Sequence, residues 1–170
     1  MATRRVQVLP YDARWAQSFA QIRDELREGL GELALSIEHV GSTSVPGLSA
    51  KPIIDIDVVI WDRSAFDAAA RALEKIGYRH EGDLGIPGRE AFGYDGKEHL
   101  QAHHLYVCAR DAAELKRHIA FRDYLRAHPE AARAYGRVKE EAAALYPWDI
   151  EKYMAHKAPF IEKIYGLIGL

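Results

Sequence analysis

The sequence predicts an α+β fold, in which a small mixed β-sheet is flanked by helices and a helical layer follows at the C-terminal end. Three observations lead to this fold class. Residues 35–76 follow the order strand, loop, strand and helix, residues 78–108 hold short β-like segments between glycine and proline turns, and helical periodicity prevails from about residue 110. The 170 residues, of which 48% are hydrophobic and 28% charged, are expected to form one domain over 1–170.

A helix is expected near the N-terminus, with Asp12 suited to its N-cap position. Apolar residues then recur three or four positions apart and form one stripe: Trp15, Phe19, Ile22, Leu26 and Leu30. The stripe ends near Gly29 and Gly31, and glycine is common where a helix stops. The spacing therefore gives this helix a single face to bury.

Two strands and a second helix are expected next. Residues 35–40 alternate between apolar and polar side chains, and a turn-rich segment follows at 41–47. Residues 53–60 are rich in β-branched side chains, which favour a strand. Ser64 suits the N-cap of a helix with a run of apolar residues: Phe66, Ala69, Ala70, Leu73 and Ile76.

The remaining segments complete the sheet and form the C-terminal helical layer. Stretches at 78–80, 90–94 and 103–108, with an Asp95-Gly96 turn signal, predict an antiparallel pair. Helices are expected from Asp111 to His128, from Pro129 or Glu130 to Tyr146, and from Asp149 onward. Some residues of these helices are interpreted as core: Tyr124, Leu125, Tyr135, Val138 and Leu145.

The charge balance excludes several classes of function. Lysine and arginine number 23 against 25 aspartates and glutamates, a net charge of -2, so there is no strong nucleic-acid signal and any anion site must be local. The single cysteine, Cys108, excludes an intramolecular disulfide. No signal-peptide pattern is present and no run reaches the roughly 18 apolar residues of a membrane span. A cytoplasmic protein with no membrane partner is expected.

An Asp-Ile-Asp sequence interrupts the most apolar strand. Asp55 and Asp57 are two residues apart, so on a strand they share one face, with Cα atoms about 6.5 Å apart. Two carboxylates this close repel each other, and a divalent cation such as Mg²⁺ removes the repulsion. The pair therefore predicts a metal site. The alternative is that each aspartate caps a loop or pairs with an arginine at a strand end.

The preceding loop adds a phosphate-binding pattern. Gly41 lets backbone N–H groups approach an anion without a Cβ in the way, and Ser42 adds a hydroxyl. A short helix after Ser42 would direct further N–H groups at phosphate oxygens. The alternative is an ordinary turn of glycine, serine and proline. The segment is neither a P-loop nor a nucleophile elbow, because the required glycine spacings are absent.

The combination of the two motifs resembles a known superfamily. The sequence has a hydrophobic residue followed by Gly-Ser, then twelve residues, then Asp-x-Asp. This pattern is similar to the signature of nucleotidyltransferases with the polymerase-β-like fold. The longer stretches His39–Leu48 and Lys51–Ile56 resemble the GrpB family of that superfamily. The resemblance continues through further segments over nearly the whole chain: Gly85–Arg89, His104-Leu105, Phe121–Arg126 and His128–Glu130.

The resemblance implies a nucleotidyltransferase-like sheet and a division of roles among the motif residues. Gly41 and Ser42 would hold a nucleoside triphosphate, and Asp55 and Asp57 would bind Mg²⁺ or Mn²⁺ for nucleotidyl transfer. Active members of the superfamily usually supply a third carboxylate from a later strand, but here that strand, residues 101–107, offers histidine. His104 is the candidate for a base or a metal ligand. The alternative is a hydrogen-bonded structural histidine.

Three basic residues are further candidates for phosphate binding, and each has a competing interpretation. Lys51 precedes the Asp-bearing strand, Arg89 lies in a segment that resembles the family, and Lys157 follows Tyr153 by one helical turn. Solvated surface charges would give the same pattern. The charge run Lys139-Glu140-Glu141 is interpreted as solvated helix surface.

The leading functional hypothesis is a metal-dependent nucleotidyltransferase with an unknown small-molecule or macromolecular acceptor. One alternative is a non-catalytic nucleotide-binding or regulatory module of the same fold, suggested by the missing third carboxylate. Another is a metal hydrolase centred on a crowded set of possible ligands: Glu98, His99, His103 and His104.

Overall fold

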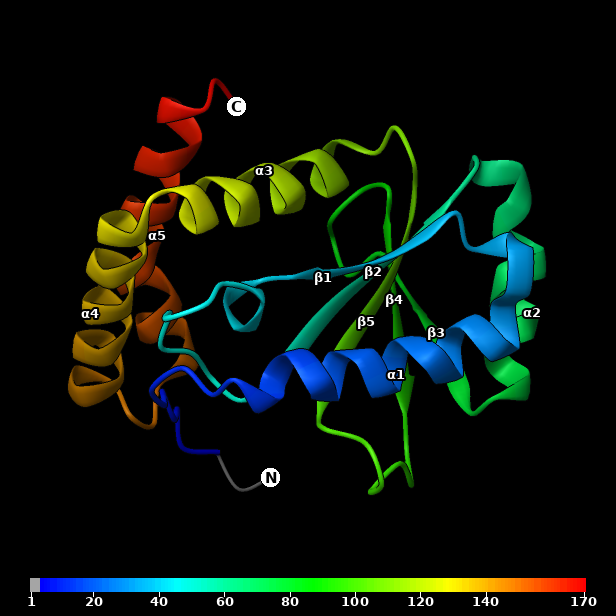
Figure 1. Ribbon diagram of the computed structural model, residues 1–170, viewed down its shortest axis with the longest axis horizontal. Helices are drawn as coiled ribbons and strands as arrows, with labels where there is room; N and C mark the ends of the chain where they lie inside the picture. The colour runs from blue at the N-terminus through cyan, green and yellow to red at the C-terminus, as the bar shows by residue number, and fades with distance from the viewer. Residues whose placement is uncertain (1–3) are drawn as a thin grey trace.

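A five-stranded mixed sheet is the centre of the computed structural model, which describes residues 4–170 (Figure 1). The strands are β1 (Ser36–Val40), β2 (Ile54–Ile60), β3 (Tyr78–Gly82), β4 (Arg89–Tyr94) and β5 (His103–Ala109). Their order is β1-β2-β5-β4-β3; β2 and β5 pair in parallel and the other neighbours are antiparallel. The predicted mixed sheet flanked by helices is confirmed.

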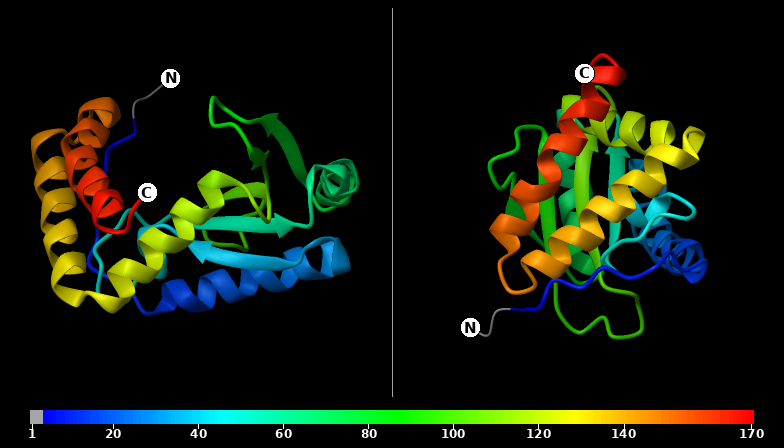
Figure 2. Two further views of the ribbon diagram at one scale, coloured as in Figure 1. Left: turned by 90° about the horizontal axis from the view of Figure 1, so that it is seen from above. Right: turned by 90° about the vertical axis from the view of Figure 1, so that its left-hand side faces the viewer.

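Five α-helices surround this sheet: α1 (Arg14–Leu30), α2 (Phe66–Lys75), α3 (Ala113–Ala127), α4 (Pro129–Leu145) and α5 (Ile150–Leu167). Helices α1 and α2 supply the core against one face, while α4 and α5 lie together beyond one end of the strands (Figure 2). No helix within residues 4–170 combines the length and the apolar character that crossing a membrane requires.

The alternation along β2 sorts its side chains onto two faces of the sheet. The apolar face of β2 is fully buried against α1 and α2: Ile54, Ile56, Val58 and Ile60. Asp55 and Asp57 consequently point to the opposite face. On the parallel neighbour β5, His104 and Tyr106 are in register with the two aspartates and share that face. The pairing of β2 with β5 thus gathers the polar side chains on the side away from the main core.

Two local expectations are wrong. Ser64 does not cap α2, because a short 3₁₀ turn (Arg63–Ala65) comes first and the carboxylate of Asp62 accepts the Ser64 N–H at 2.9 Å. Leu145 was expected in the core but is 55% exposed at the end of α4. The expected start of the last helix is confirmed, since Asp149 accepts the Lys152 N–H at 3.1 Å.

His39 is a polar side chain on the apolar face of β1. Its ring stacks on Phe19 of α1, with centroids 4.6 Å apart, and its Nε2 lies 2.9 Å from the Thr43 hydroxyl. Burial, helped by the nearby Arg126 guanidinium, lowers the pKa of His39 from 6.5 to about 4. The ring is therefore held neutral in the folded protein.

The free energy of unfolding should fall as the pH is lowered from 6.5 towards 4. In this window the unfolded state binds a proton at His39 and the folded state does not, a loss of about 3 kcal/mol at the lower limit. Urea unfolding of the parent and of His39→Gln between pH 7 and 4.5 measures it. The parent should lose more stability than the variant, and parallel profiles would contradict the assignment.

Candidate functional site

Asp55 and His104 form a polar pair across β2 and β5. Nδ1 of His104 lies 2.9 Å from Oδ1 of Asp55, and the imidazole is about half exposed. In the neutral tautomer that donates from Nδ1–H to the carboxylate, Nε2 is the ring nitrogen that can accept a proton. The structure therefore places His104 beside the first aspartate, on the site-bearing face.

Asp57 is fully buried beneath α3. Its Oδ2 lies 2.6 Å from Nδ1 of His118, and its Oδ1 has no hydrogen-bond partner. Burial raises the pKa of the Asp57 carboxyl, against the opposing effect of His118. Because Glu114 and Asp57 flank His118, their charges outweigh burial and raise the pKa of its imidazole.

The loop after β1 is shaped by Gly41. Its φ of +72° with ψ of -174° is a conformation that other residues avoid. A Cβ at this position would also collide with the carboxylate of Asp55, whose own Cβ would be 3.0 Å away. Gly41 thus allows the loop and the first aspartate to approach each other, and a 3₁₀ turn (Ser42–Ser44) follows.

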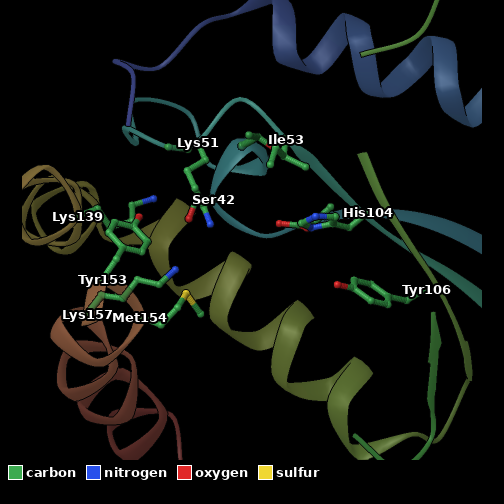
Figure 3. A pocket seen from close by; sticks show the side chains of 12 residues that line it. Ser42, Lys51, Ile53, His104, Tyr106, Lys139, Tyr153, Met154 and Lys157 are labelled. Atoms are coloured by element: carbon green, nitrogen blue, oxygen red, sulfur yellow. The ribbon is translucent and has the colours of Figure 1, made fainter. Parts of the chain in front are cut away.

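Next to this pair is a cavity of about 250 Å³ with three lysines in its wall. Lys51 comes from the loop before β2, Lys139 from α4 and Lys157 from α5, and their side chains approach the Tyr153 ring from different sides (Figure 3). Lys51 and Lys157 Nζ lie 5.3 and 5.1 Å from its centroid. The other lining residues are Ser42, Thr43, Ala50, Ile53, Asp55, His104, Tyr106, Tyr153 and Met154.

The wall of this cavity holds three lysines against the single carboxylate of Asp55. None of them has an acidic partner within 4.0 Å among residues 4–170. Burial and the charge of Lys51 lower the pKa of Lys157 to about 8, and burial lowers those of Lys51 and Lys139. Lys139 is only 2% exposed, so its interpretation as solvated surface is wrong. Such a cavity suits a ligand with several negative charges.

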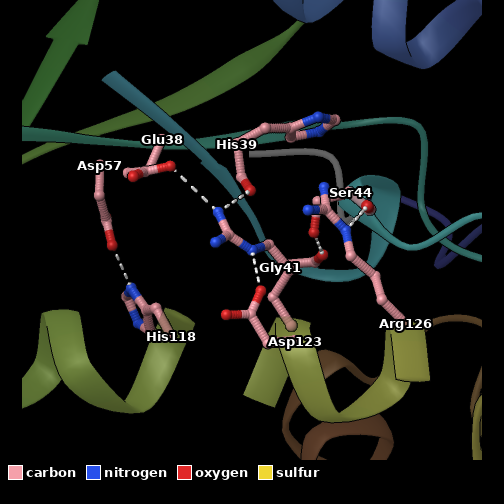
Figure 4. Close-up of polar contacts among 9 residues, drawn as sticks. Glu38, His39, Gly41, Ser44, Asp57, His118, Asp123 and Arg126 are labelled. Carbon is pink, nitrogen blue, oxygen red and sulfur yellow. Dashed lines mark hydrogen bonds and ion pairs between the residues drawn. The ribbon is translucent and has the colours of Figure 1, made fainter. Parts of the chain in front are cut away.

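Helix α3 is attached to the site by three basic residues spaced four apart. His118 contacts Asp57, Arg122 donates to Glu38 at 3.1 Å and to the His39 carbonyl at 3.2 Å, and Arg126 donates to the Ser44 carbonyl at 2.9 Å (Figure 4). The sequence reasoning missed all three. Their spacing at i, i+4 and i+8 was the available signal, because it places them on one helix face.

Arg89 lies on the other side of Asp55 from the lysines. Its guanidinium is stacked over the Tyr106 ring at 4.1 Å, in a cavity of about 200 Å³ that Gly41, Asp55 and His118 also line. The structure therefore separates Arg89 from the lysine cavity, although both adjoin Asp55.

Unsatisfied polar atoms concentrate at this site. Within residues 4–170, three buried side-chain atoms lack a hydrogen-bond partner: Asp57 Oδ1, Arg89 Nε and Tyr153 Oη. Asp57 is on β2 with Asp55, and Arg89 lines the smaller cavity next to Asp55. Tyr153 lines the lysine cavity. Because buried polar groups are nearly always paired, these atoms indicate where water, an ion or a ligand belongs.

The histidines of residues 99–104 do not form a common centre. His103 points to the opposite face and contacts the Tyr78 hydroxyl at 2.8 Å, while His99 lies 3.0 Å from Glu25 on α1. In the described part of the chain no three His, Cys, Asp or Glu side chains are grouped to hold a metal. Strand alternation separates His103 from His104, and His99 lies in the turn before β5, so the basis for the hydrolase hypothesis is removed.

The sequence matches the GrpB protein family over residues 5–166. The chain belongs to the GrpB family. Among its GrpB relatives, YqkA of Bacillus subtilis is 34% identical over 159 residues, which cover 94% of this chain and 46% of YqkA. PA4798 of Pseudomonas aeruginosa is 37% identical, with 95% of this chain and 67% of that protein covered. The chain thus spans about half the length of the first relative and two thirds of the second.

Solved structures agree with the family and extend the likeness of fold. The GrpB protein from Enterococcus faecalis superposes with a TM-score of 0.83 at 37% identity, covering 95% of this chain and 96% of that one. Two more distant structures share the fold. The GLD-2/RNP-8 complex has a TM-score of 0.58 at 14% identity, covering 79% of this chain and 55% of that one. A Cid1 poly(U) polymerase with MgGTP bound has a TM-score of 0.55 at 14% identity, covering 77% of this chain and 43% of that one. They show that this GrpB chain has the nucleotidyltransferase fold.

The carboxylates of the site fit a hard divalent cation. Mg²⁺ is usually bound through one or two protein carboxylates and completes its shell with water and substrate phosphate. Asp55 and Asp57 supply such a pair on one face of β2, and Asp57 Oδ1 is a buried acceptor without a partner. The donor set therefore suits Mg²⁺ or Mn²⁺ together with a phosphate ligand.

Replacing Gly41 with Ala should destabilise the protein more than replacing Gly96 with Ala. Both glycines have positive φ, +72° and +70°, but only at Gly41 would the new Cβ collide with Asp55. Strain and overpacking together should make the difference about 1–3 kcal/mol. Denaturant unfolding of both variants measures it. Equal losses would show that Asp55 does not constrain the loop.

Proposed function

We propose that this protein is a metal-dependent nucleotidyltransferase, which binds a nucleoside triphosphate and transfers the nucleotidyl group to an acceptor. The observation that carries the proposal is the cavity in which Ser42, Asp55 and His104 adjoin three lysines that have no acidic partner within residues 4–170. A triphosphate bound there offsets the mutual repulsion of the lysines, and Gly41 and Ser42 supply N–H and hydroxyl donors. Arg89 contributes positive charge from the other side of Asp55.

Asp55 and Asp57 hold the metal ion in this proposal. When bound, Mg²⁺ or Mn²⁺ supplies charge neutralisation for the transferring phosphoryl group. Asp57 is kept in place by His118, and Gly41 keeps the phosphate-binding loop close to Asp55. The distant fold relative with MgGTP bound is consistent with this pairing of metal and nucleotide.

His104 acts as the base that receives the acceptor's proton. Its Nδ1 is occupied by Asp55, so Nε2 is available to accept the proton as the acceptor oxygen bonds to the α-phosphorus. The bond from that phosphorus to pyrophosphate breaks at the same centre, and pyrophosphate leaves with the electron pair.

A second candidate is a non-catalytic nucleotide-binding module of the same fold. The specific observation in its favour is the neighbour of Asp55 on β5: it is a histidine and not a third carboxylate, and its ring is hydrogen-bonded to Asp55 itself. In this alternative the lysine cavity still binds nucleotide, but His104 only orients Asp55. The two candidates share their binding prediction and differ in turnover.

Mg-NTP should raise the melting temperature of the parent protein, because a ligand selective for the folded state adds about 2.7 kcal/mol at a hundred times its Kd. Lys157→Gln should weaken this binding about tenfold or more, since a charged contact to phosphate is lost. Lys163→Gln, an exposed position on the same helix, is the matched control. The screen uses the four NTPs with Mg²⁺ or Mn²⁺, and EDTA should remove the shift.

No metal-dependent shift with any NTP in the parent would contradict the proposed function. So would equal nucleotide affinity in the parent and in Asp55→Asn/Asp57→Asn, because the metal assignment rests on these two carboxylates.

His104→Ala should reduce pyrophosphate release by about 10²- to 10⁴-fold, the usual contribution of a general base, while Mg-NTP affinity changes little. The measurement is pyrophosphate release from Mg-NTP with a mixed pool of hydroxyl and amine acceptors. Binding without acceptor-dependent release in the parent would instead support the non-catalytic module.

A further inference from the structure

A second cavity, of about 430 Å³, lies on the other side of His104 and Tyr106 from the lysines. Both side chains line both cavities, so they separate two compartments of one site. The second cavity lies over β3, β4 and β5. Among its other lining residues are Arg79, Glu81, Leu84, Ala91 and Gly93.

Small residues and a bulge create this hollow. Ala91 is in register with Tyr106, and Gly93 follows two positions later on the same face of β4. On β3 the register shifts between His80 and Gly82, which leaves Glu81 as the extra residue. The Glu81 carboxylate lies over Gly93, with Oε2 only 2.6 Å from where a Cβ of Gly93 would be. The bulge thus directs a carboxylate into the space left by the missing side chain.

The two cavities differ in which charged side chains lack a partner. Glu81 is exposed and has no hydrogen-bond or ion-pair partner in the described part of the chain, whereas Arg79 is paired with Asp95 at 2.8 Å. Burial is the main reason that the pKa of the Tyr106 hydroxyl is raised; the charges of Asp55 and Asp57 add to the effect, and that of Glu81 contributes least. The second cavity therefore offers a carboxylate without a cationic partner, whereas the lysine cavity offers ammonium groups without acidic partners within residues 4–170.

We propose that the second cavity is the acceptor site and that it takes a small molecule with a hydroxyl nucleophile and a nearby amino group. This inference rests on the proposed nucleotidyl transfer. Glu81 binds the ammonium group, which places the acceptor's hydroxyl next to His104. The exposed Leu84 adds an apolar edge to the cavity.

The nucleoside triphosphate and the acceptor bind in different cavities in this proposal. The triphosphate occupies the lysine cavity, and the acceptor's hydroxyl oxygen reaches the α-phosphorus from the Glu81 side. The new oxygen–phosphorus bond forms as the bond from phosphorus to the bridging oxygen breaks. Pyrophosphate leaves with the electron pair on the lysine side, and the hydroxyl proton passes to Nε2 of His104. Separating the charges in this way also keeps pyrophosphate out of the acceptor site.

The test compares matched acceptors in the presence of Mg-NTP: ethanolamine against ethylene glycol, and glucosamine against glucose. In the parent, pyrophosphate release should be faster with each amine than with its hydroxyl counterpart. Glu81→Gln should raise the KM for the amines about ten- to a hundredfold, the effect of losing a hydrogen bond to a charged group, with kcat nearly unchanged. Gly93→Ala, whose Cβ displaces the Glu81 carboxylate, should do the same.

Glu74→Gln on α2, an exposed position on the helix that covers the other face, is the control and should leave the amine preference intact. Thermal shift with Mg-NTP is measured for every variant. A parent that fails to bind nucleotide overturns the proposed function itself. A parent that binds nucleotide but releases no pyrophosphate with any acceptor overturns nucleotidyl transfer. A parent that releases pyrophosphate but shows no amine preference, or a preference that survives Glu81→Gln, overturns only the acceptor site.

Discussion

The pairing of Asp57 with His118 is the interaction on which the arrangement of the site depends. A carboxylate buried this completely needs a partner, because desolvating an unpaired charge is very unfavourable. His118 supplies that partner from α3, and Arg122 and Arg126 continue the attachment to β1 and to the turn at Ser44. Helix α4 follows after His128 alone, and apolar packing of Ala132 and Tyr135 against Val45 and Leu48 adds to the attachment of the C-terminal helices.

Local periodicity was enough to predict which side chains share the site-bearing face. On a strand the period is two, so Asp55 and Asp57 had to point the same way, and His104 had to point away from His103. The parallel pairing of β2 with β5 could not be obtained in this manner. It joins strands that are separated in the sequence by a helix and two other strands, and only the packing of the whole sheet decides it.

The predictions failed mainly for side chains that are buried by segments distant in the sequence. Lys139 stands in a run of charged residues, which locally is indistinguishable from solvated helix surface. It is buried because α5 and the loop before β2 close over α4 at that point. His118 was missed for the same reason, since nothing in the sequence near it shows that Asp57 lies opposite. In both cases the partner is supplied by tertiary structure.

The origin of the three lysines in separate segments has a mechanical consequence. Lys51 precedes β2, whereas Lys139 and Lys157 belong to the C-terminal helices, so their repulsion acts to separate two parts of the molecule that are far apart in the chain. A polyanion bound between them would act as an electrostatic cross-link, and its departure would remove that link. The free energy that such a ligand gains by binding is therefore coupled to the free energy that holds the helical layer against the sheet, so each strengthens the other.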